Sequence, residues 1–281
     1  MNTTLPKIIS FFVAVLAVVL LVYKYPSNVW AVLVVGLLGN IIASPIAFYI
    51  VSMLDNIKQL PILFKTKILL RNKDVRISIA YLFRIKTKDH YLLVKNRTGN
   101  YYQLVGGAYK RYQTSENIFK KYKIKSDKQF RTDDGIAKND LRFRVPGKYV
   151  LDVIKWFQSK EDRETSQWRE FCEELLSTNI LCKTTFRYID YTYAGTLQTP
   201  IQKAKYLDCQ EILIYEIYDL LPSEEQKIVL DELFNKGNTE QVKWASEPLI
   251  NGLGFDEYRK EKEFDIGAHT KWAVQLKYTN E

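Results

Sequence analysis

The sequence predicts an α+β protein in which a two-helix transmembrane hairpin precedes a cytoplasmic domain with a mixed sheet. Two observations support this prediction. The N-terminal region is apolar and almost free of charge up to Leu54, and the later residues alternate between strand-like runs, turn residues and helical patterns. The predicted organisation is an anchor over residues 1–55, a linker over 56–74 and a domain over 75–281.

The apolar region divides at the turn-forming residues Pro26, Ser27 and Asn28. A helix needs roughly 20 apolar residues to cross a bilayer. The first segment, about 8–23, is short for this, and the second, about 29–54, is long enough. A cleaved signal peptide is the competing interpretation, because Lys7 precedes the first segment. A second apolar segment follows at once and no clear small-residue cleavage site is present, so we favour the hairpin over a signal peptide or a buried globular hairpin.

Basic residues predict the orientation of this hairpin. The short loop between the segments offers only Lys24, whereas five basic residues follow the second segment: Lys58, Lys65, Lys67, Arg71 and Lys73. Positive charge favours the cytoplasmic side of a membrane, so we expect both termini to face the cytoplasm.

The second apolar segment carries a stripe of small and polar residues. Gly36, Asn40 and Ser44 recur at a spacing of four, with Gly39 and Ala43 beside them. Such a stripe allows close helix packing in lipid, either within the hairpin or between chains that assemble into a homo-oligomer.

Composition limits the chemistry that is available. The chain has 281 residues, a formal charge of +9, three cysteines without paired spacing and only two histidines. This argues against a disulfide framework and against zinc sites. Metal chemistry would depend on carboxylates, which suit Mg²⁺ or Mn²⁺.

The domain is predicted to begin with three strands. They are the runs VRISIAYLFRI, YLLVKN and YYQLVGG, separated by the turns TKDH and RTGN. Further strands are expected in TTFRYIDYTYAGTLQ and CQEILIYEIYDLL, a capped helix in SEEQKIVLDELF, a loop with a short helix in KWASEPLI and a last strand in FDIGAHTKWAVQL. His269 lies in that last run, where a structural role is favoured over a catalytic one.

A helical segment further along gathers acidic residues on one face. Glu170, Glu173 and Glu174 are spaced i, i+3 and i+4, and Phe171 and Leu175 form the opposite apolar side. A solvated surface is the simplest interpretation of any one of these glutamates. Three carboxylates this close nevertheless repel one another unless a cation or a proton compensates.

The wider spacing resembles the Nudix box. Glu161 is followed after seven residues by Arg169 and Glu170, then Phe171, one further residue, Glu173 and Glu174. The resemblance implies a Nudix-like α/β/α sandwich. It also implies Mg²⁺ binding by Glu170, Glu173 and Glu174, with Glu173 catalytic if the protein is a hydrolase, and a supporting role for Glu161 and Arg169.

Two glycine positions depart from the Nudix box. Leu176 occupies the last one, and Lys155 occupies the first. In Nudix proteins a strand ending in Gly-Gly usually precedes the box directly, and here Gly106 and Gly107 end the strand LVGG. We therefore interpret residues from about 108 to 155 as an insertion.

This insertion is basic and rich in aromatic residues. It contains 13 basic and 6 acidic residues, a difference of +7. Basic and aromatic side chains suit phosphates and stacked bases. A solvated lid or a patch on anionic lipid is the alternative. The predicted ligand-binding residues are Tyr109, Lys110, Arg111, Arg142 and Arg144.

An apolar two-helix anchor followed by such a domain resembles the SMODS-associated NUDIX proteins of bacterial CBASS antiphage systems. The resemblance implies a multi-pass effector in the bacterial inner membrane, functionally linked to a nucleotidyltransferase (CD-NTase) that makes a cyclic oligonucleotide. The domain would sense this ligand, and the helices would assemble and disrupt the bilayer. A membrane-tethered Nudix hydrolase acting on a nucleoside diphosphate derivative or on the signal is the main alternative, and a scaffold or nucleic-acid binder is a third.

Overall fold

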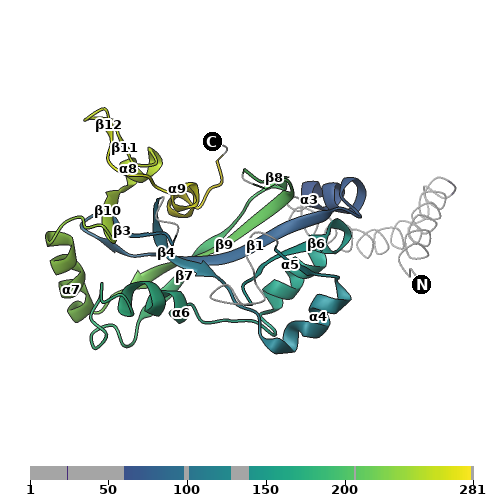
Figure 1. Ribbon diagram of the computed structural model, residues 1–281, viewed down its shortest axis with the longest axis horizontal. Coiled ribbons are helices and arrows are strands. Elements are labelled where there is room, and N and C mark those ends of the chain that lie inside the picture. Colours follow the sequence, from purple (N-terminus) through teal and green to yellow (C-terminus); the bar gives the residue numbers. More distant parts are fainter. Residues whose placement is uncertain (1–23, 25–59, 98–100, 128–138, 206, 280–281) are drawn as a thin grey trace. The chain divides into compact units, whose positions relative to one another are not determined.

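The computed structural model describes Lys24 and residues 60–97, 101–127, 139–205 and 207–279 (Figure 1). The chain divides into two compact units, Met1–Pro61 and Ile62–Glu281, and the second is described here. The predicted hairpin and its small-residue stripe lie outside the described residues. Among the residues that are described, no helix is both long enough and apolar enough to cross a membrane.

Strand β1 (Asp74–Arg84) is the centre of the sheet. Its alternate residues Val75, Ile77, Ile79, Tyr81 and Phe83 are fully buried in the larger of two hydrophobic cores. Leu82 points to the second core on the opposite face. The period-2 pattern of β-branched and aromatic residues therefore gives a strand that is covered on both faces.

The sheet splits into two branches along one edge of β1. β6 (Arg142–Pro146) pairs with the first half of β1 and β4 (Tyr102–Ala108) with the second half, both antiparallel. The β4 branch continues through β3 (His90–Lys95) to β10 (Val242–Ser246), and the β6 branch ends at β5 (Lys125–Ser126). Short β2 (Lys86–Thr87) pairs with β3.

The other edge of β1 pairs in parallel with β9 (Gln210–Leu221) along nearly its whole length. β9 then pairs antiparallel with β7 (Asp190–Gln198) and β8 (Gln202–Lys203). The sheet is therefore mixed, as predicted.

Helices cover both faces of this sheet (Figure 1). The larger core lies beneath α5 (Val150–Ser159), α6 (Trp168–Phe171) and α7 (Glu224–Asn235). The second core lies beneath α8 (Glu247–Asn251) and α9 (Ala268–Gln275). This layered α/β arrangement is consistent with a Nudix-like domain.

The smaller elements complete the domain. They are α3 (Leu60–Phe64), a π-helical turn over Lys65–Leu69, 3₁₀ turns over Gln113–Ser115 and Gly147–Tyr149, α4 (Glu116–Lys121), a π-helical turn over Cys172–Leu176, and the hairpin of β11 (Phe255–Asp256) and β12 (Glu261–Lys262). The first two lie within the segment that was predicted to be a linker.

Most of the predicted elements are confirmed. The three initial strands are β1, β3 and β4, and the predicted capping box of Ser223 and Gln226 begins α7. The prediction of a final strand was wrong, because the run forms helix α9 after Gly267. The run KWASEPLI contains strand β10 where a loop was expected, followed by the predicted short helix.

The segment 108–155 is integrated into the domain. Leu141, Phe143, Val145, Val150 and Val153 belong to the larger core and are at most 1% exposed. This segment therefore supplies β6 to the central sheet and α5 to one helical layer, rather than forming an appendage.

Candidate functional site

The Gly-Gly end of β4 contacts the helical segment that carries Glu170, Glu173 and Glu174, which we call the glutamate turn. The backbone N–H of Gly106 donates to a carboxylate oxygen of Glu174 at 2.8 Å. A Cβ at Gly107 would lie 2.4 Å from the Glu170 carboxyl group, so only glycine leaves room for that side chain. The strand end and the helical turn, 63 or more residues apart in the chain, therefore form one site, as the Nudix-like interpretation expects.

Arg169 connects the groups of this site. Its guanidinium donates to Glu170 at 2.5 Å, to both carboxylate oxygens of Glu164 at 3.0 and 3.2 Å, and to the carbonyl of Ala108 at 2.7 Å. Burial alone would lower the pKa of Arg169, but the hydrogen bonds and charges of Glu164 and Glu170 outweigh burial and raise it. The guanidinium therefore stays charged and holds the turn against β4.

The carboxylate that supports Arg169 is Glu164, which corrects the prediction of Glu161. Glu161 is exposed, and among the described residues the hydrogen bond that it makes is from its backbone N–H to the Ser159 hydroxyl. Glu164 is 8% exposed and also accepts from the backbone N–H of Lys110 at 3.1 Å. Sequence spacing alone pointed to Glu161, and the only signal for Glu164 was a second glutamate close by.

The three clustered glutamates differ in their surroundings. Burial raises the pKa of Glu170, and it raises the pKa of Glu174 to about 8. Glu173 is exposed and lies 3.5 Å from Arg169 and 3.6 Å from Arg97.

Nudix domains commonly use Mg²⁺, and carboxylate oxygens are its preferred ligands. Within the described ranges, however, no group of three or more His, Cys, Asp or Glu residues is arranged to hold a metal ion. Glu170 is engaged by Arg169 and Glu174 by Gly106. The carboxylates of Glu170 and Glu174 are therefore not arranged as metal ligands in this structure, and Mg²⁺ binding by the three glutamates stays a prediction.

Two of the predicted ligand-binding residues belong to the interior. Tyr109 has no exposed surface; its ring packs on Tyr81 at 4.7 Å and its hydroxyl contacts Glu216, which corrects the expectation that it stacks on a ligand. Arg144 is mostly buried beside Asp127, in a charge cluster that also contains Arg76 and Glu211.

Two of the other three predicted ligand-binding residues line a pocket of about 270 Å³ near β6. Arg111 and Arg142 line it together with Lys120 and Lys123, and the guanidinium of Arg111 lies 4.3 Å from the ring centre of Phe119. Among the described residues of the lining, Glu116 and Asp140 are acidic and four side chains are basic, a difference of +2. We call this the basic pocket.

The basic pocket is adjacent to the glutamate turn. The chain leaves β4 at Ala108, contacts Glu164 through the Lys110 backbone and reaches the pocket at Arg111. Lys110 itself pairs with Asp140 at 3.2 Å. Burial raises the pKa of Asp140, while Arg142 and Lys110 oppose the rise. Sequence reasoning missed Lys120 and Lys123 as pocket residues. Lys120 lies in α4, whereas Lys123 lies beyond its end in a turn with a φ of +54°, so helical spacing does not pair them.

His269 lies away from these groups. Its ring stacks on Tyr215 at 5.8 Å and meets Tyr101 edge-on, and burial lowers its pKa to about 4. The imidazole is therefore neutral at physiological pH, which agrees with the predicted structural role.

Comparison with known proteins gives the family. The model of the SMODS-associated NUDIX domain matches residues 74–274, which include the whole sheet, the glutamate turn and the basic pocket. No curated protein matches the chain at a significant level. The match covers most of the chain, and the strand end and the turn meet as a Nudix-like fold requires, so the chain belongs to the SMODS-associated NUDIX domain family.

Proposed function

We propose that the protein is a membrane-anchored effector of a bacterial antiphage system, and that its NUDIX-like domain binds a cyclic oligonucleotide in the basic pocket. The observation that carries this proposal is the pocket itself, because four basic side chains and the ring of Phe119 suit a compact ligand with phosphates and bases. Family membership supports the effector role. The partners would be the ligand, a CD-NTase that makes it, the lipid bilayer and further copies of this chain.

Strand β6 offers a route from the ligand to the anchor. It begins at Arg142 in the basic pocket and leads to Gly147, whose N–H donates to the Lys73 carbonyl at 3.0 Å. A Cβ at Gly147 would lie 2.2 Å from the Leu70 carbonyl, so this contact is tight. Ligand contacts with Arg142 would therefore bias the position of residues 70–73, which follow the apolar N-terminal region. Assembly of the apolar segments would then disrupt the membrane.

Replacing Arg142 with alanine is expected to weaken ligand binding about tenfold, the loss of one charge-assisted contact. The measurement is titration of the full-length protein in detergent with a panel of cyclic dinucleotides and trinucleotides. The matched control is Arg187→Ala, which removes an exposed arginine outside the pocket. Equal affinity of the Arg142→Ala and Arg187→Ala proteins would contradict the assignment of the pocket.

The same proteins test the membrane step. The wild-type protein in liposomes should release an entrapped dye when the bound cyclic oligonucleotide is added, and Arg142→Ala should need about tenfold more ligand. Ligand binding without dye release would agree with the proposed sensing of the ligand but would contradict the proposed disruption of the membrane.

The hydrolase alternative depends on the glutamate turn. The observation in its favour is that Glu170, Glu173 and Glu174 are all present beside the Gly-Gly strand end. If this alternative holds, the protein will turn over a nucleoside diphosphate derivative with Mg²⁺, and Glu173→Gln will abolish turnover. Because Glu173 is exposed, this substitution is not expected to change stability by more than about 0.5 kcal/mol. Ligand binding without turnover favours the sensor.

A further inference from the structure

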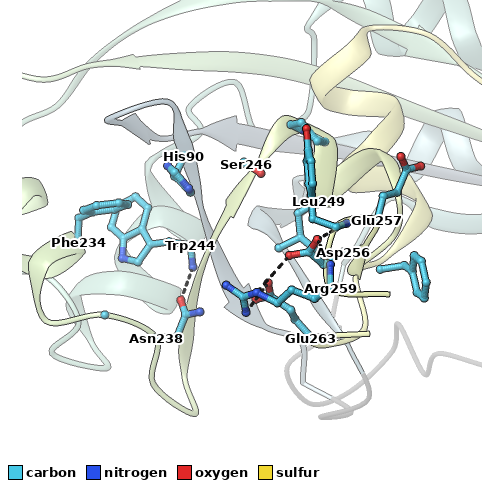
Figure 2. Close-up of a pocket in the computed structure, with 14 residues that line it drawn as sticks. His90, Phe234, Asn238, Trp244, Ser246, Leu249, Asp256, Glu257, Arg259 and Glu263 are labelled. Carbon is cyan, nitrogen blue, oxygen red and sulfur yellow. Dashed lines mark hydrogen bonds and ion pairs between the residues drawn. The ribbon is translucent and has the colours of Figure 1, made fainter. Parts of the chain in front are cut away.

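A larger pocket of about 500 Å³ lies on the β4 branch of the sheet (Figure 2). It is bounded by β3, β10, the C-terminal end of α7, the beginning of α8 and the β11–β12 hairpin. In the strand order β10 and β5 are the two ends, so this pocket and the basic pocket lie on different branches. Its volume is in the range typical of small-molecule sites.

One side of this pocket is aromatic. Phe234 meets Trp244 edge-on at 5.3 Å and also packs on His90 at 5.2 Å (Figure 2). Trp244 is 5% exposed, and within the described part of the chain its indole N–H has no hydrogen-bond partner. A buried donor without an acceptor costs free energy. Phe234 is only partly buried, so its ring is the aromatic surface that this side offers to a ligand.

The other side is acidic. Asp256, Glu257 and Glu263 line it with a single guanidinium, that of Arg259, which lies 3.6 Å from Asp256 and 3.4 Å from Glu263. Figure 2 shows these side chains gathered across the view from Phe234 and Trp244. Among the described lining residues, three carboxylates against one guanidinium leave a difference of −2. The lining therefore disfavours phosphates and favours groups that donate hydrogen bonds.

We propose that this pocket binds a planar nitrogen heterocycle with an amino group, of the purine nucleobase class, as a nucleoside without phosphate. The ring would pack against the aromatic side at Phe234, and its N–H groups would donate to the carboxylates. Aromatic side chains stack on bases at a gain typical of base recognition. This site is separate from the proposed cyclic-oligonucleotide site and does not depend on it.

The test is calorimetric titration of the full-length protein in detergent with adenosine, guanosine and the 5′-monophosphate of each. We expect at least one nucleoside to bind, and its monophosphate to bind more weakly because of the acidic lining. Glu257→Gln should weaken nucleoside binding about tenfold, because a charge-assisted hydrogen bond is lost. The matched control is Glu261→Gln, an exposed position of the same hairpin that does not line the pocket.

A second variant, Phe234→Leu, keeps an apolar side chain and removes the aromatic ring of the lining. It should weaken nucleoside binding while Arg142→Ala leaves that binding unchanged, which separates this proposal from the one above. The proposal is overturned if neither nucleoside binds at millimolar concentration, if a monophosphate binds more tightly than its nucleoside, or if Glu257→Gln and Glu261→Gln bind alike.

Discussion

Replacing Gly106 with alanine is expected to lower the free energy of unfolding by about 4 kcal/mol, the sum of backbone strain and overpacking. Gly106 has a φ of +144°, and a Cβ there would lie 2.1 Å from the backbone carbonyl oxygen of Tyr81. Tyr81 is fully buried in the central strand, so that carbonyl cannot move aside without distorting the pairing of β1 and β4. The measurement is urea or thermal unfolding, where we expect a fall in Tm of roughly 10 °C for a domain of this size.

The matched control is Gly237→Ala. Gly237 also has a positive φ, +80°, but no atom of the described residues lies within 4 Å of the position that its Cβ would take. An alanine there would be strained only by the left-handed backbone conformation, so we expect the free energy of unfolding to fall by about 1 kcal/mol. Similar losses for the two variants would show that the close approach to Tyr81 contributes nothing to stability.

The Nudix resemblance assigned the Gly-Gly strand end and the three glutamates to one box, because both carry strong local patterns. The strand has β-branched alternation ending in Gly-Gly, and the turn has carboxylates at helical spacing. What it did not predict was the choice of Glu164 over Glu161. That choice depends on how residues 160–167 fold back toward Lys110, which is set by tertiary contacts rather than by spacing.

The direction in which side chains point was the other feature that could not be predicted from the sequence. Tyr109 and Arg111 are two residues apart, and both were predicted to face a ligand, yet Tyr109 points into the core while Arg111 lines the basic pocket. The basic and aromatic composition of residues 108–155 is compatible with either direction of a given side chain, toward the core or toward the pocket. Helix α9 was mistaken for a strand because its apolar residues were counted as one run, although Trp272 and Ala273 follow His269 at helical spacing.

Replacing Arg169 with alanine is expected to lower the free energy of unfolding by about 3–5 kcal/mol, as is typical when one partner of a buried ion pair is removed. The variant leaves Glu164, which is 8% exposed, and Glu170, which is 5% exposed, without their cation. It also removes the hydrogen bond to Ala108. Urea unfolding measures the loss. Arg169→Lys should restore only part of it, because an ammonium cannot bind both oxygens of Glu164 and Ala108 in a planar fork.

Two companion variants identify the cause of this loss. Arg97→Ala removes another arginine near the same turn, but its side chain is 57% exposed and lies 3.6 Å from Glu173, so we expect a change below about 0.5 kcal/mol. The double variant Arg169→Ala with Glu164→Gln should be more stable than Arg169→Ala alone, since the buried charge is removed together with its partner. If the double variant loses the sum of both single effects, the role of Arg169 is packing rather than charge compensation. If the double variant is more stable than Arg169→Ala, charge compensation by Arg169 is what holds the glutamates against the end of β4.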